Sequence, residues 1–480
     1  MNILHYFLGF PPLHGGGLMI YATNLAEEQL KMGHKVFLLM PGEYISFIGK
    51  SKIKYYGIQE SLPIYKIVNS HPFTLSGIKN PKKFIKPKNK NNYSLLLKNL
   101  NIEVLHVHSL IGFPKEILVQ AKRLGIKTVF TTHDYFGICP RVDLFKYNHT
   151  QCDDYKSGSE CVLCNLNASN KTIVRRNIRL LLPSFYDSAR NICKCIKKTF
   201  LHPKKKKEEI LHIESNLNPS LHKIDQNKAK RFTMFREYYK NIIENFDLII
   251  FNSSITKREF FKYINIDKNK TKILHVTHSS IKDNRNKINY VPVKDGKVNF
   301  TYMGPLNYKK GFFDLVDVFK KIKNNYSNWQ LNVYGDCSNL DLKTFDTDFF
   351  NFFGKYAHND FINIFSNSSV LIIPSKLKET FGFIGLEAFS YGIPAIVSEN
   401  VGFSDLIKNK LNGVIYTEDK DNKNLEKEII NILKNPEFLL KYNKEIKEGE
   451  FLFDISNHCK KVLDIYKGSE EFYEDWDPDF

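Results

Sequence analysis

Two glutamates in the stretch "KETFGFIGLEAFSYGIPAIVS", residues 378–398, have the type and spacing of groups that act on a ligand. Glu379 and Glu387 stand on either side of a glycine-containing turn. An ionised carboxylate only accepts hydrogen bonds, so its natural partners are hydroxyl donors such as those of a sugar or a ribose. The structural alternative is that one glutamate caps a helix and the other lies on a solvated helix face.

The residues around this pair predict a strand, a loop, a helix and a second strand. The apolar run "VLIIPS", residues 370–375, is typical of a strand buried on both faces. Helical periodicity follows over residues 384–391, and Gly392 and Pro394 then suit a helix cap and a helix stop. In such units the loop after the first strand meets a helix N-terminus, which favours an anion such as phosphate. The first glutamate belongs to this loop and the second to the helix.

The order and spacing of these residues resemble the nucleotide-sugar site of the retaining glycosyltransferases of family 4, which have the GT-B fold. The family signature is two glutamates separated by seven residues, here Glu379, "TFGFIGL" and Glu387, with "PS" before and "GIPAIVS" after. The resemblance implies that Glu379 contacts hydroxyls of the donor sugar and that Glu387 contacts the ribose hydroxyls. It also implies donor contacts in the intervening turn, from Thr380, Phe381, Gly382 and Phe383.

A second motif of this resemblance lies in "KVNFTYMGPLNYKKGFFDLVDVFKKI", which predicts a strand, a loop opened by Gly304 and an amphipathic helix. The family has Gly, Arg, four residues, Lys and Gly in this loop, and its two cations neutralise the donor diphosphate. Lys310 and the following glycine match, whereas Pro305 stands at the position of the arginine. This departure removes one phosphate cation, and Lys309 is the candidate to compensate in part. By the same resemblance, the main chain near Tyr356 holds the nucleotide base.

The N-terminal half begins with residues that predict a strand, a glycine-rich loop, a helix and a strand. Gly15, Gly16 and Gly17 precede the helix and allow the main chain to approach a ligand closely. The family carries a double-glycine loop at this place, which implies donor contacts from Gly16 and Gly17. Two further strands end at His108 and at His133. A hydrogen-bonded framework role is an equal interpretation of His108. For His133 the resemblance implies a place beside the donor sugar, because the family has a His-Asp pair there.

Four cysteines lie close together in the sequence after "YFGICPR", a stretch that resembles a subgroup of the family with cysteines at this point. A cytosolic chain keeps its thiols reduced, so Cys139, Cys152, Cys161 and Cys164 suggest a tetrahedral structural zinc site that pins a loop. His149 is a substitute for one of these ligands. Unbound thiols and disulfides are the remaining alternatives.

A long insertion that we place at about 139–235 contains these cysteines and then basic residues. From residue 165 onward it exceeds the usual length of the family and includes "VRRNIRLLLPSFYDSARNICKCIKKTF", which mixes basic and apolar residues. A basic helix with an apolar face suits an anionic membrane surface. A solvated helical insertion packed on its own domain is the alternative.

The composition of the 480 residues, with 42% hydrophobic and 25% charged, is that of a folded globular protein. A formal net charge of +19 favours an anionic partner, either a membrane surface, a phosphorylated acceptor or nucleic acid. The sequence contains no nucleic-acid recognition motif, and a lysine-rich genome would explain the charge without any ligand. No apolar run reaches the ~18 residues of a membrane span, and the N-terminus lacks the basic start of a signal peptide. We therefore expect a cytoplasmic protein, with the inner face of the membrane as its candidate peripheral surface.

The chain length favours two domains, which we predict to be doubly wound parallel α/β domains that face one another across a cleft. Residues 1–282 would form an acceptor-side Rossmann-like domain and residues 283–455 a nucleotide-sugar-binding one. Residues 456–480 would form a C-terminal helix or tail that crosses back or is disordered.

The function that the resemblance implies is retaining transfer of a sugar from a nucleotide diphosphate sugar, of UDP or GDP type, to a hydroxyl of a glycan or lipid-linked acceptor. His133, Glu379 and Lys310 are its implied catalytic residues, and no metal or cofactor is required for catalysis. The alternatives are a catalytically degenerate scaffold protein, which the missing arginine favours, and another enzyme of the same fold such as a nucleotide-sugar epimerase. The sequence does not identify the sugar, the base or the acceptor.

Overall fold

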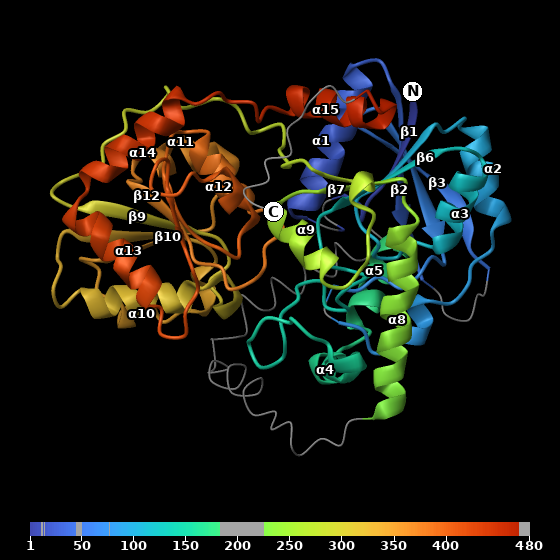
Figure 1. Ribbon diagram of the computed structural model, residues 1–480, viewed down its shortest axis with the longest axis horizontal. Helices are drawn as coiled ribbons and strands as arrows, with labels where there is room; N and C mark the ends of the chain where they lie inside the picture. The colour runs from blue at the N-terminus through green and yellow to red at the C-terminus, as the bar shows by residue number, and fades with distance from the viewer. Residues whose placement is uncertain (11–12, 14, 45–49, 76, 183–224, 470–480) are drawn as a thin grey trace. The chain divides into compact units, whose positions relative to one another are not determined.

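The computed structural model describes the chain except residues 11–12, 14, 45–49, 76, 183–224 and 470–480. It divides into two compact units (Figure 1). Among the described residues, unit 1 comprises Met1–Phe251, Glu259–Ile273 and 462–469, and unit 2 comprises Asn252–Arg258 and Leu274–Lys461.

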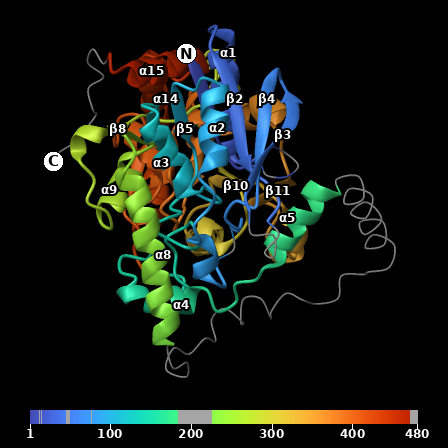
Figure 2. The same cartoon turned by 90° about the vertical axis from the view of Figure 1, so that its right-hand side faces the viewer.

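Unit 1 contains an eight-stranded sheet in the order β3-β4-β2-β1-β5-β6-β7-β8. All neighbouring strands are parallel except β3 and β4, which pair antiparallel at one edge, and Figure 2 shows β2, β4 and β3 at this end of the sheet. The strands are β1 (Asn2–Tyr6), β2 (Lys35–Pro41), β3 (Lys52–Gln59), β4 (Leu62–Val68), β5 (Val104–Val107), β6 (Lys127–Thr132), β7 (Leu248–Phe251) and β8 (Thr271–Ile273).

The central strands of unit 1 are apolar and buried on both faces, as expected for parallel strands that helices cover. Leu4, Tyr6, Leu105, Val107 and Phe130 contribute to one large core that includes residues of the covering helices. These helices are α1 (Gly17–Lys31), α2 (Asn91–Asn99), α3 (Lys115–Arg123), α4 (Ser159–Cys164), α5 (Lys171–Leu181) and α8 (Gln226–Glu244), while α9 (Ser254–Phe261) and α15 (Ile455–Lys467) belong in part to each unit.

Unit 2 contains a six-stranded sheet in the order β11-β10-β9-β12-β13-β14, with every neighbouring pair parallel. Its strands are β9 (Val298–Met303), β10 (Trp329–Tyr334), β11 (Phe350–Gly354), β12 (Val370–Ile373), β13 (Ala395–Ser398) and β14 (Val414–Tyr416). Its helices are α10 (Phe312–Ile322), α11 (Phe361–Ser366), α12 (Phe383–Phe389), α13 (Lys423–Lys434) and α14 (Glu437–Glu448). The prediction of two parallel-sheet α/β domains is therefore confirmed.

The strand and helix predicted around the two glutamates are present with slightly shifted ends. The strand is β12, which ends at Ile373, and the helix is α12, which begins at Phe383 and ends at Phe389. Gly392 has φ +76°, so the expected left-handed conformation after the helix is observed. The last two residues of "VLIIPS", Pro374 and Ser375, belong to the loop, because Pro374 has no backbone N–H to donate to a neighbouring strand.

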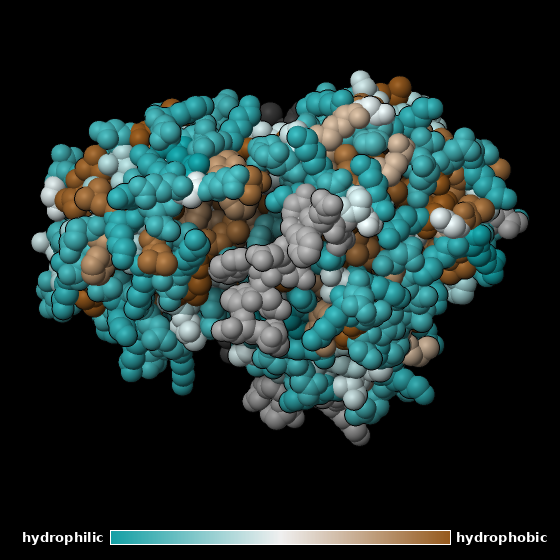
Figure 3. Space-filling model, turned by 45° about the horizontal axis from the view of Figure 1, so that its top comes forward, coloured by the Kyte–Doolittle hydropathy of each residue, from teal (hydrophilic) through white to brown (hydrophobic). Residues whose placement is uncertain are grey.

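Part of the predicted insertion lies in helices of unit 1. Its described parts include α4, α5 and α8, and residues 183–224 lie outside the described part of the chain. Helix α8 packs its buried side chains, among them Phe232, Phe235 and Tyr239, into the core of unit 1. Among the described residues, no helix combines the length and the apolar character needed to cross a membrane. Hydrophilic side chains cover most of the face shown in Figure 3.

Candidate functional site

Two loops come together at the carboxyl edge of the sheet in unit 2, because β9 and β12 are parallel neighbours. The loop after β9 contains Lys309, whose carbonyl oxygen accepts hydrogen bonds from the amides of Lys376 (3.0 Å) and Leu377 (3.3 Å) in the loop after β12. The topology therefore joins two motifs that are about seventy residues apart in the sequence.

Lys310 and Glu379 form an ion pair between these two loops. The Nζ of Lys310 lies 2.8 Å from Oε2 of Glu379, and the two side chains are 30% and 14% exposed. The main chain of Glu379 is fixed, because its amide donates to Asn400 O (2.7 Å) and its carbonyl oxygen accepts from the amide of Gly402 (3.0 Å). A cation and an anion are thus held side by side at a position that keeps partial contact with solvent.

Two glycines at this site have no room for a side chain. Gly311 has φ +69°, and a Cβ there would lie 1.7 Å from the carbonyl oxygen of Pro374. Gly382 has φ +96°, and a Cβ there would lie 2.7 Å from Cγ1 of Val401. The first glycine lets the two loops touch, and the second provides the left-handed turn directly before α12.

Glu387 lies inside α12 and is only 8% exposed. Its Oε1 is 3.2 Å from Nε2 of His278 and 3.7 Å from Nδ1 of His358. The alternative of a solvated helix glutamate is therefore wrong for this residue. A buried carboxylate needs partners, and these two histidines provide them.

Sequence reasoning missed His278 and His358, because neither belongs to a motif near the glutamates. His278 follows β8, and its ring packs against Phe383 at 5.0 Å and His358 at 5.4 Å. His358 stands two residues after Tyr356, the residue predicted beside the nucleotide base. For His358, its position close to Tyr356 in the sequence was a signal that could have identified it.

Tyr356 lies near Glu387 in the structure, although the sequence separates them. Burial, together with a smaller effect of charge repulsion from the Glu387 carboxylate, raises the pKa of the Tyr356 hydroxyl to about 12. The hydroxyl is therefore neutral at physiological pH and is able to donate a hydrogen bond. Gly304, at the end of β9, donates its amide to Tyr334 O (2.9 Å) and has φ +144°.

The remaining predicted residues of the turn differ in exposure. The side chain of Phe381 is 2% exposed, so only its main chain is available to a ligand, and its carbonyl oxygen already accepts from Phe403 N (2.6 Å). Thr380 and Phe383 are half-buried. Pro305, at the position of the missing arginine, is exposed, and its carbonyl oxygen accepts from the hydroxyl of Tyr302 (2.7 Å).

Unit 1 places its predicted residues at the carboxyl edge of its own sheet. Gly16 has φ +122° directly before α1, which begins at Gly17, and its carbonyl oxygen accepts from the amides of Met19 and Ile20. His133 directly follows β6, and its ring lies 4.8 Å from that of Tyr21 on α1. The glycine loop and His133 thus adjoin the same helix.

Asp134, next to His133, is held by two hydrogen bonds. Its carboxylate accepts from the amide of Phe136 and the hydroxyl of Ser109, both at 2.8 Å. Burial nevertheless raises the pKa of Asp134 to about 6, because the two hydrogen bonds only partly offset desolvation. The His-Asp pair is consequently a rigid element of unit 1.

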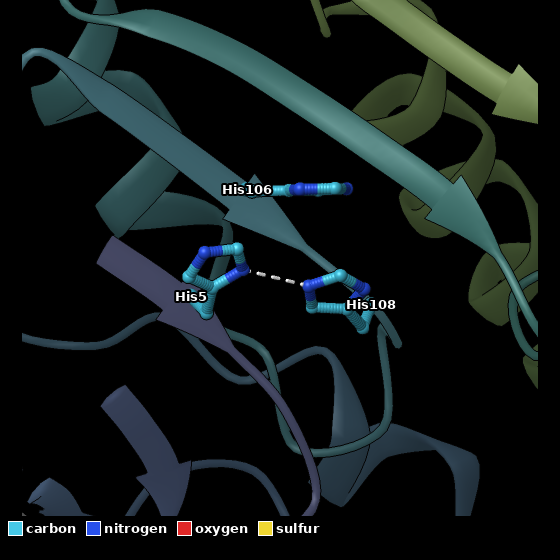
Figure 4. Close-up of side chains that lie close together, drawn as sticks. All are labelled: His5, His106 and His108. Atoms are coloured by element: carbon cyan, nitrogen blue, oxygen red, sulfur yellow. Dashed lines mark hydrogen bonds between the residues drawn. The ribbon is translucent and has the colours of Figure 1, made fainter. Parts of the chain in front are cut away.

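A group of buried histidines lies behind His133. His5 and His106 are register partners on β1 and β5, and His108 follows two residues later on the same face. Nδ1 of His5 and Nε2 of His108 are 2.9 Å apart, as Figure 4 shows. His108 therefore has the hydrogen-bonded framework role that we weighed for it.

The hydrogen bonds around this group define a neutral network. The Gln29 amide donates to the Tyr466 hydroxyl (3.3 Å) and accepts from Nε2 of His5 (2.7 Å), which leaves Nδ1 of His5 to accept from His108. The Tyr466 hydroxyl lies 2.5 Å from Nδ1 of His106, and Nε2 of His106 lies 2.7 Å from the hydroxyl of Thr131, so both ring nitrogens are within hydrogen-bond distance of a hydroxyl. Burial lowers the pKa of His5 to about 4, in agreement with neutral rings.

These three histidines are also the group within the described chain whose ligand atoms all lie within 4.8 Å of one another. Both nitrogens of His5 and both of His106 are already engaged in hydrogen bonds. A metal ion would have to replace these bonds, and its charge would have no carboxylate within the group. We therefore interpret the group as a framework of the unit 1 core.

The four cysteines predicted to bind zinc lie in one region of unit 1 as free thiols. Nη2 of Arg236 donates to Sγ of Cys161 at 3.5 Å, and burial raises the pKa of Cys152 and Cys164 to about 12. No three of the described cysteines bring their sulfurs within 4.8 Å of one another. Zinc binding would require these sulfurs to move together, and metal analysis of the purified protein is its test.

The two units, each with a mostly parallel sheet, define the GT-B fold. Structures that share the fold include a sucrose-phosphate synthase from Thermosynechococcus elongatus, with a TM-score of 0.55, 15% identity and 98% of each chain covered. Anabaena HepE in complex with UDP has a TM-score of 0.55 and 11% identity, with 98% of this chain and 100% of that chain covered. At these identities the likeness shows the fold.

Two family models match separate parts of the chain. The model described as "Glycosyl transferases group 1" matches residues 283–449, in unit 2, and "Glycosyltransferase Family 4" matches residues 15–157, in unit 1. These matches support a family 4 type of GT-B glycosyltransferase, as the sequence motifs predicted.

Curated relatives are about one quarter identical to this chain over the aligned residues. A protein in the cps region of Klebsiella pneumoniae is 26% identical over 34% of this chain and 45% of its own length. An uncharacterised glycosyltransferase of Methanocaldococcus jannaschii is 26% identical over 38% of this chain and 50% of its own length. The chain thus spans about half the length of these relatives.

Proposed function

We propose that this chain transfers a sugar from a nucleotide diphosphate sugar, of UDP or GDP type, to a hydroxyl of a glycan or lipid-linked acceptor, with retention of configuration. The observation that carries the proposal is the Lys310–Glu379 pair at 2.8 Å. In a glycosyl diphosphate the phosphate oxygens and the sugar hydroxyls flank one anomeric carbon. A cation beside a hydroxyl acceptor matches that order of groups.

The chemical step breaks the bond between the anomeric carbon and the diphosphate oxygen and forms a bond to the acceptor oxygen. The acceptor proton passes to the departing diphosphate, and attack from the same face retains the configuration. Negative charge grows on the diphosphate as the first bond breaks, so a fixed cation such as Lys310 stabilises the transition state more than the ground state. Because Lys310 supplies this charge, the proposal requires no divalent cation.

Glu387 would bind the ribose. Its second oxygen is available to accept from ribose hydroxyls while Oε1 stays with His278, which fixes the orientation of the carboxylate. Tyr356 lies close enough to feel the charge of Glu387, so the base would lie on the same side as the ribose. The crystallised complexes of Anabaena HepE with UDP and with UDP-glucose support a nucleotide sugar as the ligand class.

The test is thermal stabilisation of the full chain by UDP, GDP, CMP and ADP sugars. A ligand that binds the folded state raises the melting temperature by mass action, so the panel ranks the donors. We expect one nucleotide class to stabilise the protein and Glu387→Ala to weaken that binding about tenfold or more. Glu379→Ala should mainly lower turnover. The exposed Glu437 on α14 provides the matched control, because Glu437→Ala changes the charge equally.

Two results would overturn the proposal. If no nucleotide sugar stabilised the protein, the degenerate scaffold alternative would be favoured. If Glu379→Ala and Glu387→Ala both transferred sugar as well as the parent, the site assignment would be wrong. A product of inverted configuration would contradict the retaining mechanism alone, and a change of configuration at another sugar carbon would favour the epimerase alternative.

The cysteine-containing insertion is part of the proposal only as a subgroup feature. Two of the four cysteines, Cys161 and Cys164, lie in α4, which packs against α8 in unit 1. Their proposed role is to hold the insertion on the acceptor-side unit, with or without zinc.

A further inference from the structure

Four neighbouring strands of unit 2 each contribute one polar residue to a cluster next to the Lys310–Glu379 pair. Strands β9, β12, β13 and β14 are parallel neighbours, so the loops that follow them leave the same edge of the sheet. In the order of the strands, these loops contribute Tyr308, Lys376, Asn400 and Glu418. The topology therefore gathers polar side chains that lie far apart in the sequence.

The ammonium group of Lys376 is the centre of this cluster. Its Nζ lies 2.5 Å from Oδ2 of Asp314, in the first turn of α10, and 3.9 Å from Oε1 of Glu418. It also donates to the Tyr308 hydroxyl at 3.1 Å and lies 4.4 Å from the centre of that ring. The side chains of Lys376 and Asp314 are 13% and 15% exposed, and charges buried to this extent need such partners.

Lys376 is ionised in this environment. Burial alone lowers the pKa of its ammonium group, but the hydrogen bonds with Asp314 and Tyr308 outweigh burial, so the pKa lies above its ordinary value. Burial raises the pKa of Glu418, an effect that Lys376 and Asn400 partly offset. The ion pair between Lys376 and Asp314 therefore persists at physiological pH.

One side of the cluster is attached to the loop that carries Lys310. Tyr308 lies two residues before Lys310, and Asp314 lies four residues after it, at the start of α10. The carbonyl oxygen of Lys309 accepts from the main-chain amide of Lys376 at 3.0 Å. The loop is thus held on both sides of Lys310 by contacts with one residue of the neighbouring loop.

The other side of the cluster is attached to the main chain of Glu379. Oε2 of Glu418 accepts from the side-chain amide of Asn400 at 2.8 Å. The carbonyl oxygen of Asn400 accepts from the amide of Glu379 at 2.7 Å. Asn400 is only 6% exposed, so this connection is shielded from water. The cluster therefore joins the loop of Lys310 to Glu379 by a route separate from their own ion pair.

We propose that Lys376 is a positioning residue of the donor site, which holds Lys310 and Glu379 at the spacing that a glycosyl diphosphate requires. The inference rests on the proposed function, because it takes Lys310 as the cation that contacts the diphosphate. Pro305 stands at the position of the missing arginine, so phosphate binding depends the more on where Lys310 is held. A loop that is already fixed loses less conformational freedom when its side chains bind a ligand.

The first experiment measures pyrophosphate binding to the full chain by calorimetry, in the wild type, in Lys376→Met, in Lys310→Gln and in the double variant. Methionine is similar to lysine in length and carries no charge. We expect each single variant to lose about tenfold in affinity. The double variant should bind within about twofold of Lys310→Gln, because Lys376 acts through Lys310. Lys323→Met, at the other end of α10 and paired with Asp346, is the matched control and should bind like the wild type.

A second variant, Asp314→Asn, separates positioning from simple charge. This substitution removes a negative charge beside the proposed diphosphate site, which by charge alone would strengthen pyrophosphate binding. Because it also removes the nearest partner of Lys376, positioning predicts weaker binding instead. Asparagine keeps the size of the aspartate side chain, so this variant decides the question if Lys376→Met does not fold.

The second experiment separates positioning from a general loss of structure. It measures binding of uridine and guanosine, which lack the diphosphate, from the broadening of their NMR signals. We expect Lys376→Met to keep its cooperative melting transition and to bind the nucleoside that binds the wild type with unchanged affinity. Glu387→Ala should show the reverse, with weaker nucleoside binding and unchanged pyrophosphate binding.

Four results would overturn the proposal. The first two are wild-type pyrophosphate affinity in a folded Lys376→Met variant and stronger pyrophosphate binding in Asp314→Asn. The third is a double variant in which the losses of Lys376→Met and Lys310→Gln multiply, and the fourth is an equal loss of nucleoside and pyrophosphate binding in Lys376→Met. Failure of the proposed function is seen separately, as an absence of stabilisation of the wild type by any nucleotide sugar, whereas the pyrophosphate measurements do not depend on a nucleotide.

Discussion

Unit 2 carries its candidate site on charged groups that loops hold near the surface, whereas unit 1 buries neutral polar groups behind its candidate residues. In unit 2 Lys310 pairs with Glu379, and both side chains retain some contact with solvent. In unit 1 hydrogen bonds join His5 to Gln29, Gln29 to Tyr466 and Tyr466 to His106, and these residues are almost fully buried. The ion pair in unit 2 can exchange its partners for groups of a ligand, whereas the buried network in unit 1 can only hold the candidate residues next to it in place.

The comparison indicates that the polar residues of the two units serve different purposes, ligand contacts in unit 2 and stability in unit 1. Replacing a group in the unit 2 pair removes a ligand contact at a small cost in stability, because partly exposed ion pairs contribute little to folding. Replacing a group in the unit 1 network leaves a buried donor or acceptor without a partner, which costs stability. Function and stability should therefore respond to different substitutions in the two units.

The largest expected effect is on catalysis in unit 2. Lys310→Gln should lower kcat/KM by about 100-fold to 1000-fold, because it removes a fixed charge at the developing diphosphate. The melting temperature should change little. Steady-state kinetics with the donor found by the stabilisation panel measures the effect. Lys355→Gln, a mostly exposed side chain paired with Asp336, is the control and should retain activity.

If Lys310→Gln retained full activity, the Lys310–Glu379 pair would have a structural role, and the proposed difference between the two units would be wrong. A loss of activity together with a large loss of stability would also contradict it. Lys309→Gln sharpens the result, because a further loss in that variant would identify the substitute for the arginine that Pro305 replaces.

The next effect is the acid sensitivity of unit 1. The pKa of His5 is lowered by burial from 6.5 to about 4, so below pH 6.5 the unfolded chain binds a proton that the folded chain does not. Folding stability is therefore complete above pH 6.5 and falls as the pH decreases from 6.5 toward 4, by about 3 kcal/mol for this one group. The pKa of His108 is lowered in the same direction.

Urea unfolding between about pH 7 and about pH 5 measures this slope. The variant His5→Gln retains hydrogen-bonding capacity without a titrating ring, so its stability should depend less on pH than that of the parent. A parent whose stability does not change over this range would show that the network is not neutral and buried as described.

The smallest expected effect comes from one hydroxyl. Tyr466→Phe removes the link between Gln29 and His106 and should cost about 1 to 3 kcal/mol, because it leaves buried polar groups unpaired. Donor binding should be unchanged, because Tyr466 belongs to unit 1 and the proposed donor site to unit 2. Thermal unfolding with and without nucleotide sugar tests both statements. Weaker nucleotide binding in Tyr466→Phe would contradict the separation of roles.

The sequence predicted the part of the molecule that depends on local pattern. The glutamate pair, Gly382 and the strand before them could be identified because a tight turn and a buried strand each impose residue types at fixed spacing. The parallel order of the strands then brings Lys310 to Glu379, which the sequence implied only through the family resemblance. The separate roles of the two glutamates, contact with the donor sugar for Glu379 and with the ribose for Glu387, remain predictions.

The sequence could not predict contacts made between distant segments. Nothing near His278 signals that it will meet Glu387, and nothing near His5 signals a bond to His108 on another strand. His106 contacts Tyr466 of α15, and His108 contacts His5 of β1, both of which lie far from them in the sequence. The basic helix in the insertion was predicted, while its attachment through Arg176 to Leu8 O and Pro41 O, near the ends of β1 and β2, was not.

Helix α15 limits where the chain can be cut into fragments that fold by themselves. Helix α15 begins in unit 2 and ends in unit 1, where Tyr466 completes the hydrogen bonds of Gln29 and His106. An N-terminal fragment that stops at Ile273 would contain the whole sheet of unit 1 and still lack a piece of its interior. Such a fragment would need a peptide of the final helix supplied in trans. Strand β1, near the start of the chain, and helix α15 are therefore parts of one folding unit.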